Sequence, residues 1–80
     1  MKVFKIEDLS YNGIQNGVHS WIHPQGQQPY YWHPDWLHIA EDITGLHGRK
    51  DLDIKVGETA SEEHAKQAII DQMNDQDKDS

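Results

Sequence analysis

The sequence of 80 residues holds 14 acidic and 7 basic side chains, giving a formal net charge of −7 at pH 7, with six histidines and no cysteine. This length suits one small domain, and the lack of cysteine excludes disulfides, thiolate catalysis and cysteine-ligated zinc. Nucleic-acid affinity comes mostly from lysine and arginine that neutralise phosphates, so the charge argues against direct nucleic-acid binding. No apolar run is long enough for a signal-peptide core or a membrane span, and we expect a cytoplasmic protein that does not bind membranes.

The charge is unevenly distributed along the chain. Residues 1–34 contain two acidic and two basic side chains, whereas residues 35–80 contain twelve acidic and five basic ones. The sequence therefore predicts a neutral, aromatic half and an acidic half.

The first segments predict short extended structure followed by turns. Residues 3–6 have the alternation of a short strand, with Phe4 and Ile6 on one face. Two Asn-Gly pairs, Asn12-Gly13 and Asn16-Gly17, are typical of positions that require a positive φ angle. Residues 8–17 are therefore predicted to form a turn-rich connection, with room for a tight hairpin of its own.

The segment from residue 19 to residue 38 contains all three tryptophans and all three prolines. A turn signal at Gln25-Gly26 separates two stretches rich in aromatic and β-branched residues, which predicts a β-hairpin. In the predicted register, Trp21 lies opposite Tyr30 and His19 lies opposite Trp32. One face of this aromatic hairpin then carries His19, Trp21, His23, Tyr30 and Trp32.

The middle of the chain predicts one helix and one strand. Trp36, Ile39, Ala40 and Ile43 repeat at the spacing of one helical face, which predicts a helix over residues 34–44. Next, Leu52, Ile54 and Val56 alternate with polar residues, as expected for a strand with one buried face.

The C-terminal part predicts a second helix. Thr59 and Glu62 have the spacing of a capping box, and a stripe of small and aliphatic side chains follows them. This stripe consists of Ala65, Ala68, Ile69 and Met73. We expect a single domain over residues 1–74 and a disordered acidic tail over residues 75–80.

Together these elements predict an α+β fold. An antiparallel sheet of about four strands, including the aromatic hairpin, is covered on one face by two helices. Because two helices cover only one face, some aromatic side chains of the hairpin are expected to stay exposed.

The histidines and a neighbouring hydroxyl group are the candidate metal-binding and catalytic residues. On a strand at about 3.3 Å per residue, His19 and His23 stand roughly 13 Å apart, too far to share a metal ion. Ser20 next to His19 resembles a dyad, but adjacent strand residues face opposite ways. Glu62, Glu63 and His64 lie where they would complement a helix dipole. The sequence thus predicts a non-enzymatic protein with no catalytic, cofactor-binding or metal-binding residues.

The leading functional prediction is a small interaction or regulatory module. Its predicted partner is a protein, or a second copy in a weak homodimer, contacted through the aromatic hairpin. The predicted contact residues are His19, Trp21, His23, Tyr30 and Trp32. Two alternatives stay open: an acidic nucleic-acid mimic that inhibits a DNA- or RNA-binding protein, and histidine-mediated transition-metal binding.

Overall fold

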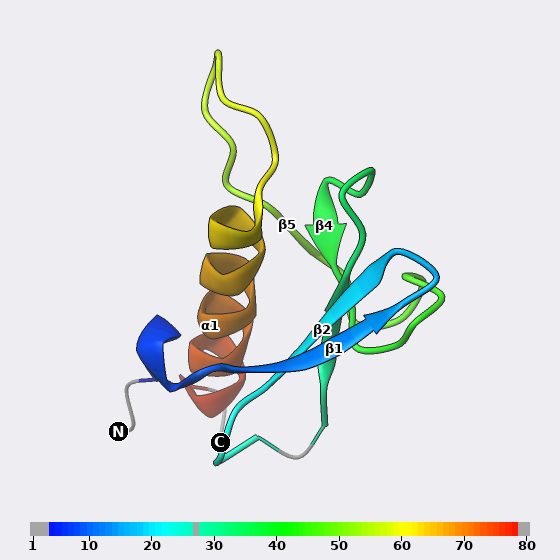
Figure 1. Ribbon diagram of the computed structural model, residues 1–80. Helices are drawn as coiled ribbons and strands as arrows, with labels where there is room; N and C mark the ends of the chain where they lie inside the picture. The colour runs from blue at the N-terminus through cyan, green and yellow to red at the C-terminus, as the bar shows by residue number, and fades with distance from the viewer. Residues whose placement is uncertain (1–3, 27, 79–80) are drawn as a thin grey trace.

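The computed structural model describes residues 4–26 and 28–78, and it describes side chains of the last helix up to Asp75. The elements in chain order are the 3-10 helix η1 (Ile6–Asp8), strands β1 (Ser10–Gln15), β2 (Val18–Ile22), β3 (Tyr30–Trp32), β4 (His38–Ile39) and β5 (Lys50–Asp51), and helix α1 (Glu62–Lys78). Strands β1, β2 and β3 form an antiparallel sheet in that order, and β4 pairs with β5. Helix α1 stands beside the strands, and a loop of residues 53–60 projects beyond its first turn (Figure 1).

The α+β class is as predicted, but the arrangement differs from the prediction. The described residues form one α-helix, a three-stranded sheet and a two-stranded sheet, so the predicted four-stranded sheet with two helices is not confirmed. The two sheets are linked by a single antiparallel bridge between Tyr31 and Ala40. No helix among the described residues is long and apolar enough to cross a membrane.

The hairpin of β1 and β2 turns at the second Asn-Gly pair, where both residues take positive φ angles. Asn16 and Gly17 have φ angles of 54° and 82°, as a two-residue turn with the twist of a hairpin requires. Gly13 has a φ angle of 111° at a β-bulge between Tyr11 and Gly13. A turn is thus confirmed at Asn16-Gly17, whereas Asn12-Gly13 lies within strand β1, and the turn-rich connection predicted over residues 8–17 is mostly strand.

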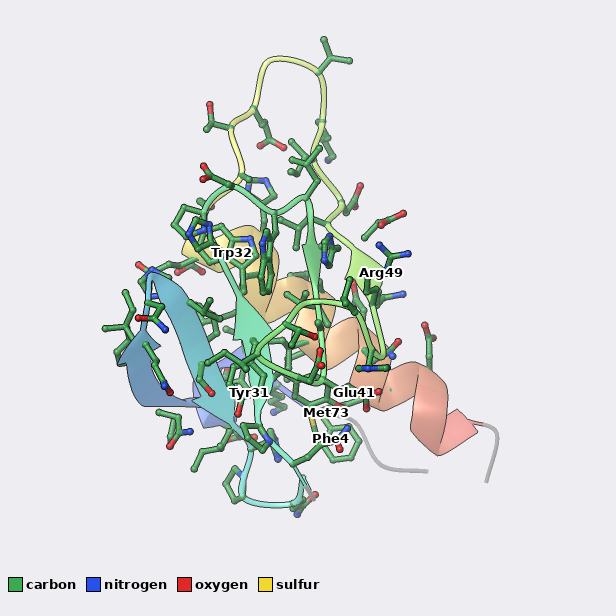
Figure 2. All side chains as sticks on the ribbon, turned by 90° about the vertical axis from the view of Figure 1, so that its right-hand side faces the viewer. Phe4, Tyr31, Trp32, Glu41, Arg49 and Met73 are labelled. Carbon is green, nitrogen blue, oxygen red and sulfur yellow. The ribbon has the colours of Figure 1, made fainter. Side chains whose placement is uncertain are left out.

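The predicted register of the aromatic hairpin is confirmed. Trp21 lies opposite Tyr30, and His19 lies opposite Trp32. The rings of Trp21, Tyr30 and Trp32 pack in the core with α1, whose predicted stripe is also buried. The helical residues of this core are Ala65, Ala68, Ile69, Ile70 and Met73. At one end of the core, Met73 of α1 and the ring of Phe4 lie near the 23–26 turn (Figure 2).

The helix predicted over residues 34–44 is wrong. Trp36 N donates to His33 O in a turn, and strand β4 follows. Ala40 and Tyr31 exchange two backbone hydrogen bonds of 2.8 and 2.9 Å, which requires an extended backbone at Ala40. Tertiary pairing therefore overrides a helical spacing of apolar residues.

The strand predicted over residues 3–6 and the strand predicted from Leu52 to Val56 are also wrong. Residues 6–8 form η1, and Val3 of the predicted strand lies outside the described residues. Only Lys50 and Asp51 form strand β5, although Leu52 N still donates to Leu37 O. Further on, Glu58 N donates to Lys55 O, so the chain turns where the strand was predicted to continue.

The start of α1 differs from the predicted capping box. The helix begins at Glu62, and Ala65 N donates to Ser61 O, so Ser61 rather than Thr59 precedes the first turn. The helix continues to Lys78, through most of the segment predicted to be a disordered tail. The last two residues of that segment lie outside the described part of the chain.

Candidate functional site

The predicted contact residues are mostly inside the molecule. Trp21, Tyr30 and Trp32 are only 3%, 3% and 2% exposed, and His23 is buried as well. Burial, followed by the charge of Glu41, raises the pKa of Tyr30. The expectation that these aromatic rings form an exposed patch is therefore wrong, because one helix and the neighbouring strand β4 enclose them.

His23 has a structural environment. Its Nδ1 accepts a hydrogen bond from Gln25 N at 3.0 Å, so in the neutral ring Nε2 carries the proton. Among the described residues Nε2 has no hydrogen-bond partner, and Asp8 Oδ2 lies 3.9 Å away. The ring of Phe4 meets it edge-on at 5.1 Å between centroids. His23 thus fixes the turn after β2 and offers no surface for a partner.

The aromatic face does reach the surface, but on strand β1. In the sheet register, Tyr11 lies opposite Trp21, and Ile14 lies opposite His19. Tyr11 and Ile14 therefore share the face of the buried rings, yet they are 52% and 58% exposed. The hydroxyl of Tyr11 and Nδ1 of the partly buried His19 are hydrogen-bonded at 2.9 Å.

Strand β1 also presents backbone hydrogen-bonding groups at the edge of the sheet. It lies first in the strand order, and no other strand of the described residues pairs with its outer side. Gln15 and Val18 flank the two-residue turn and form a hydrogen-bonded pair, so the alternating pattern directs the backbone groups of Ile14 and Tyr11 outward. The residues with exposed apolar side chains are thus the residues with unpaired edge groups.

This edge lacks most of the usual protection against pairing. Sheet edges are commonly shielded by charged side chains, proline or bulges. The sequence of β1, SYNGIQ, contains no charge and no proline, and its bulge lies between the two outward-facing residues. We therefore take the outer edge of β1, with Tyr11, Ile14 and His19, as the candidate site, and call it the β1 edge.

A second surface feature lies between the segment after β5 and helix α1. A shallow hollow there is lined by Asp53, Glu63, His64, Gln67, Ala68 and Asp71. Three of these residues are acidic, and Lys66 on the same helix already pairs with Glu63 at 2.9 Å. We call this feature the acidic hollow. It belongs to the acidic half that the sequence predicts.

The histidines are dispersed over the molecule. Across residues 4–26 and 28–78, no three side chains of the His, Cys, Asp or Glu types lie close enough together to hold a metal ion. Ser20, considered beside His19, faces the other side of the sheet, where its Oγ accepts a hydrogen bond from Asn12 Nδ2 at 3.3 Å.

No family model, curated protein or solved structure matches this chain.

Proposed function

We propose that the protein is an interaction module that binds a partner by strand addition at the β1 edge. An added strand would satisfy the outward backbone groups of Tyr11 and Ile14 and lay its own side chains beside theirs. The observation that supports this most strongly is the coincidence of exposed apolar side chains and unpaired edge groups on a neutral strand.

The partner that best fits this edge is the β1 strand of a second copy. In an antiparallel pair related by a twofold axis, Tyr11 of one copy lies opposite Ile14 of the other, and the reverse pair forms at the same time. Each such aromatic and β-branched pair contributes roughly 0.2–1 kcal/mol. Neither strand brings a charge to the contact.

Equilibrium ultracentrifugation over a range of concentrations tests this proposal. Wild type should show a concentration-dependent dimer, and Ile14→Lys should be monomeric because it places an unpaired charge opposite Tyr11 of the other copy, and a lysine on an edge strand opposes pairing. Gln15→Lys is the matched control, because it adds the same charge to the same strand but at a residue whose backbone already pairs with Val18.

Amide hydrogen exchange identifies the contact at the level of single residues. On association, exchange should slow at Tyr11 and Ile14, while Gly13 and Gln15, which already face β2, should change little. The proposal would be contradicted if Ile14→Lys dimerised as strongly as wild type. It would also be contradicted if association of the wild type slowed amide exchange at residues outside the β1 edge instead.

The acidic hollow supports a second candidate, binding to the basic groove of a nucleic-acid-binding protein. Lys50 and Lys66 are paired with Asp75 and Glu63, at 3.2 and 2.9 Å, so the positive charges of these two lysines are already offset. Asp53, Asp71 and their acidic neighbours would then mimic phosphates. Reversing the charge of Asp53 and Asp71 should abolish such binding and leave the β1 edge unaffected.

A further inference from the structure

Three side chains from the projecting loop and the first turn of α1 form a hydrogen-bonded row. Ser61 Oγ and His64 Nδ1 are 2.9 Å apart, and His64 Nε2 lies 3.3 Å from Glu58 Oε1. The side chain of His64 is mostly buried, whereas about half of Glu58 is exposed. A serine, a histidine and a carboxylate in this order form the arrangement that activates a serine hydroxyl as a nucleophile.

The hydrogen bonds determine which nitrogen of His64 is protonated. The pKa of Glu58 is lowered, first by the hydrogen bond from Lys55 N and then by the bond from His64, so its carboxylate is ionised at neutral pH. An ionised carboxylate only accepts hydrogen bonds, and therefore His64 Nε2 donates to it. The lone pair of Nδ1 is then free to accept a hydrogen bond from the Ser61 hydroxyl. His64 is thus placed to remove the proton of Ser61.

The surroundings provide space and hydrogen-bond donors. His64 also lines the acidic hollow, a shallow space of about 160 Å³ beside this row, whereas Ser61 and Glu58 do not line it. Glu62 N and Glu63 N precede the first intrahelical hydrogen bond, from Ala65 N to Ser61 O. These two N–H groups have no carbonyl partner within the helix, so they can donate to an oxygen that becomes negative.

We propose that Ser61 is a nucleophilic serine that takes acyl groups from small neutral or cationic esters, with His64 as its base and Glu58 as a positioning residue. This site is separate from the β1 edge and does not depend on strand addition. The carboxylates of Asp53, Glu63 and Asp71 around the hollow disfavour anionic substrates.

The reaction has two steps, acylation of Ser61 and hydrolysis of the acyl-serine. Ser61 Oγ bonds to the acyl carbon while its proton passes to His64 Nδ1, and the bond from that carbon to the alcohol oxygen then breaks. The alcohol leaves with the proton held by His64. Water then attacks the acyl carbon while giving a proton to His64 Nδ1, and the bond from that carbon to Ser61 Oγ breaks. His64 returns the proton to Ser61 Oγ, which releases the carboxylic acid and restores the Ser61 hydroxyl.

The test uses a fluorophosphonate as a covalent probe and 4-nitrophenyl acetate as a substrate. Displacement of fluoride by an activated serine should leave a phosphonyl group on Ser61, located by peptide mass mapping of the full chain. Wild type should also hydrolyse 4-nitrophenyl acetate. His47→Gln is the matched control for unassisted imidazole catalysis, because exposed His47 lies 3.8 Å from the Asp42 carboxylate, just as His64 lies beside that of Glu58.

Four variants separate catalysis from helix capping. Ser61→Asn keeps an acceptor suited to the helix start but removes the nucleophile, so labelling should vanish while the helical circular dichroism stays. His64→Gln should lower the acylation rate by about a hundredfold or more. Glu58→Gln should lower kcat several-fold at unchanged KM, since it acts only through His64. His47→Gln should match wild type.

The opposite results would overturn the proposal. If Ser61 serves only to begin α1, then Ser61→Asn will hydrolyse the ester at the wild-type rate. Absence of the phosphonyl group from Ser61, or its presence on another residue alone, would equally exclude an activated serine.

Discussion

At the scale of single residues, Asp42 organises the loop between β4 and β5. Its carboxylate accepts hydrogen bonds from the hydroxyl of Thr44 and from the backbone N–H groups of Leu46 and His47, the latter two at 3.2 Å. These bonds, with that from Thr44 the largest cause, lower the pKa of Asp42 below its usual 3.8. The Asp42 carboxylate thus fixes the backbone of Leu46 and His47 in this loop.

This arrangement predicts how the loop responds to acid. A carboxyl group whose pKa is lower in the folded state stabilises that state above its unfolded pKa, and this contribution is lost as the pH falls through the folded pKa. The amide proton shifts of Leu46 and His47, followed by NMR from neutral pH downward, should therefore titrate with a midpoint below 3.8. The same titration in Asp42→Asn should lose this step, and a wild-type midpoint at or above 3.8 would contradict the assigned bonds.

Gly45 has a role that its sequence position does not reveal. Its φ angle is 77°, and an added Cβ would lie 2.8 Å from the Trp36 ring, which stacks on His38 at 5.4 Å between centroids. Gly45→Ala should therefore lower the free energy of unfolding by more than the about 1–2 kcal/mol of backbone strain alone. Gly57→Ala is the control, since its φ angle is 88° and nothing lies within 4 Å of the added atom. If urea denaturation gave equal losses of unfolding free energy for the two variants, the Trp36 ring would move aside at no measurable cost.

At the scale of elements, helix α1 depends on its small residues. Ala65 and Ala68 are 0% and 3% exposed and lie in the core with Trp21 and Trp32. Close approach of the helix to the aromatic rings leaves no room for a larger side chain at these positions. The helix is therefore the element whose contact face tolerates change least.

Ala68→Glu should unfold the domain or lower its stability by several kcal/mol, because it buries an unpaired charge. Thermal melting followed by circular dichroism gives the measurement. Gln67→Glu adds the same charge to the exposed neighbouring position and should cost no more than about 1 kcal/mol, through loss of the hydrogen bond from Gln67 to Asp71 and repulsion between the two carboxylates. A melting temperature of Ala68→Glu within a few degrees of that of Gln67→Glu would show that the buried face of α1 is different.

The elements that sequence could predict are those in which local pattern and tertiary contacts agree. The register of the aromatic hairpin and the buried face of α1 follow from alternation and helical spacing, and both are confirmed. The helix predicted around Trp36 failed because Ala40 pairs with Tyr31, a contact that spacing does not reveal.

The candidate sites were harder to predict for a related reason. The bulge in β1 inserts an extra residue, so Tyr11 and Ile14 share a face although they are three positions apart. This breaks the period of two that marks a strand. Ser61 and His64 have the spacing of helical neighbours, which sequence could have shown, but Glu58 joins them only because the projecting loop folds back.

At the scale of the whole molecule, the net charge lies apart from the proposed contact surface. The net charge of −7 arises in residues 35–80, while β1 carries no charged side chain. Pairing of two copies through β1 therefore gains nothing from ion pairs and is opposed by the mutual repulsion of two acidic molecules. Binding of the acidic half to a basic partner would be driven by the same charges.

Salt dependence follows from this separation and distinguishes the two functional candidates. Between about 10 mM and about 1 M NaCl the Debye length falls from about 30 Å to about 3 Å, which screens the repulsion between copies. The dimer formed through β1 should therefore strengthen as salt rises at neutral pH, whereas capture of a basic protein by the acidic hollow should weaken. Ultracentrifugation at each salt concentration measures the first effect, with Ile14→Lys expected to stay monomeric throughout. Wild-type association that weakens as salt rises would show that ion pairs, and not the neutral β1 edge, hold the copies together.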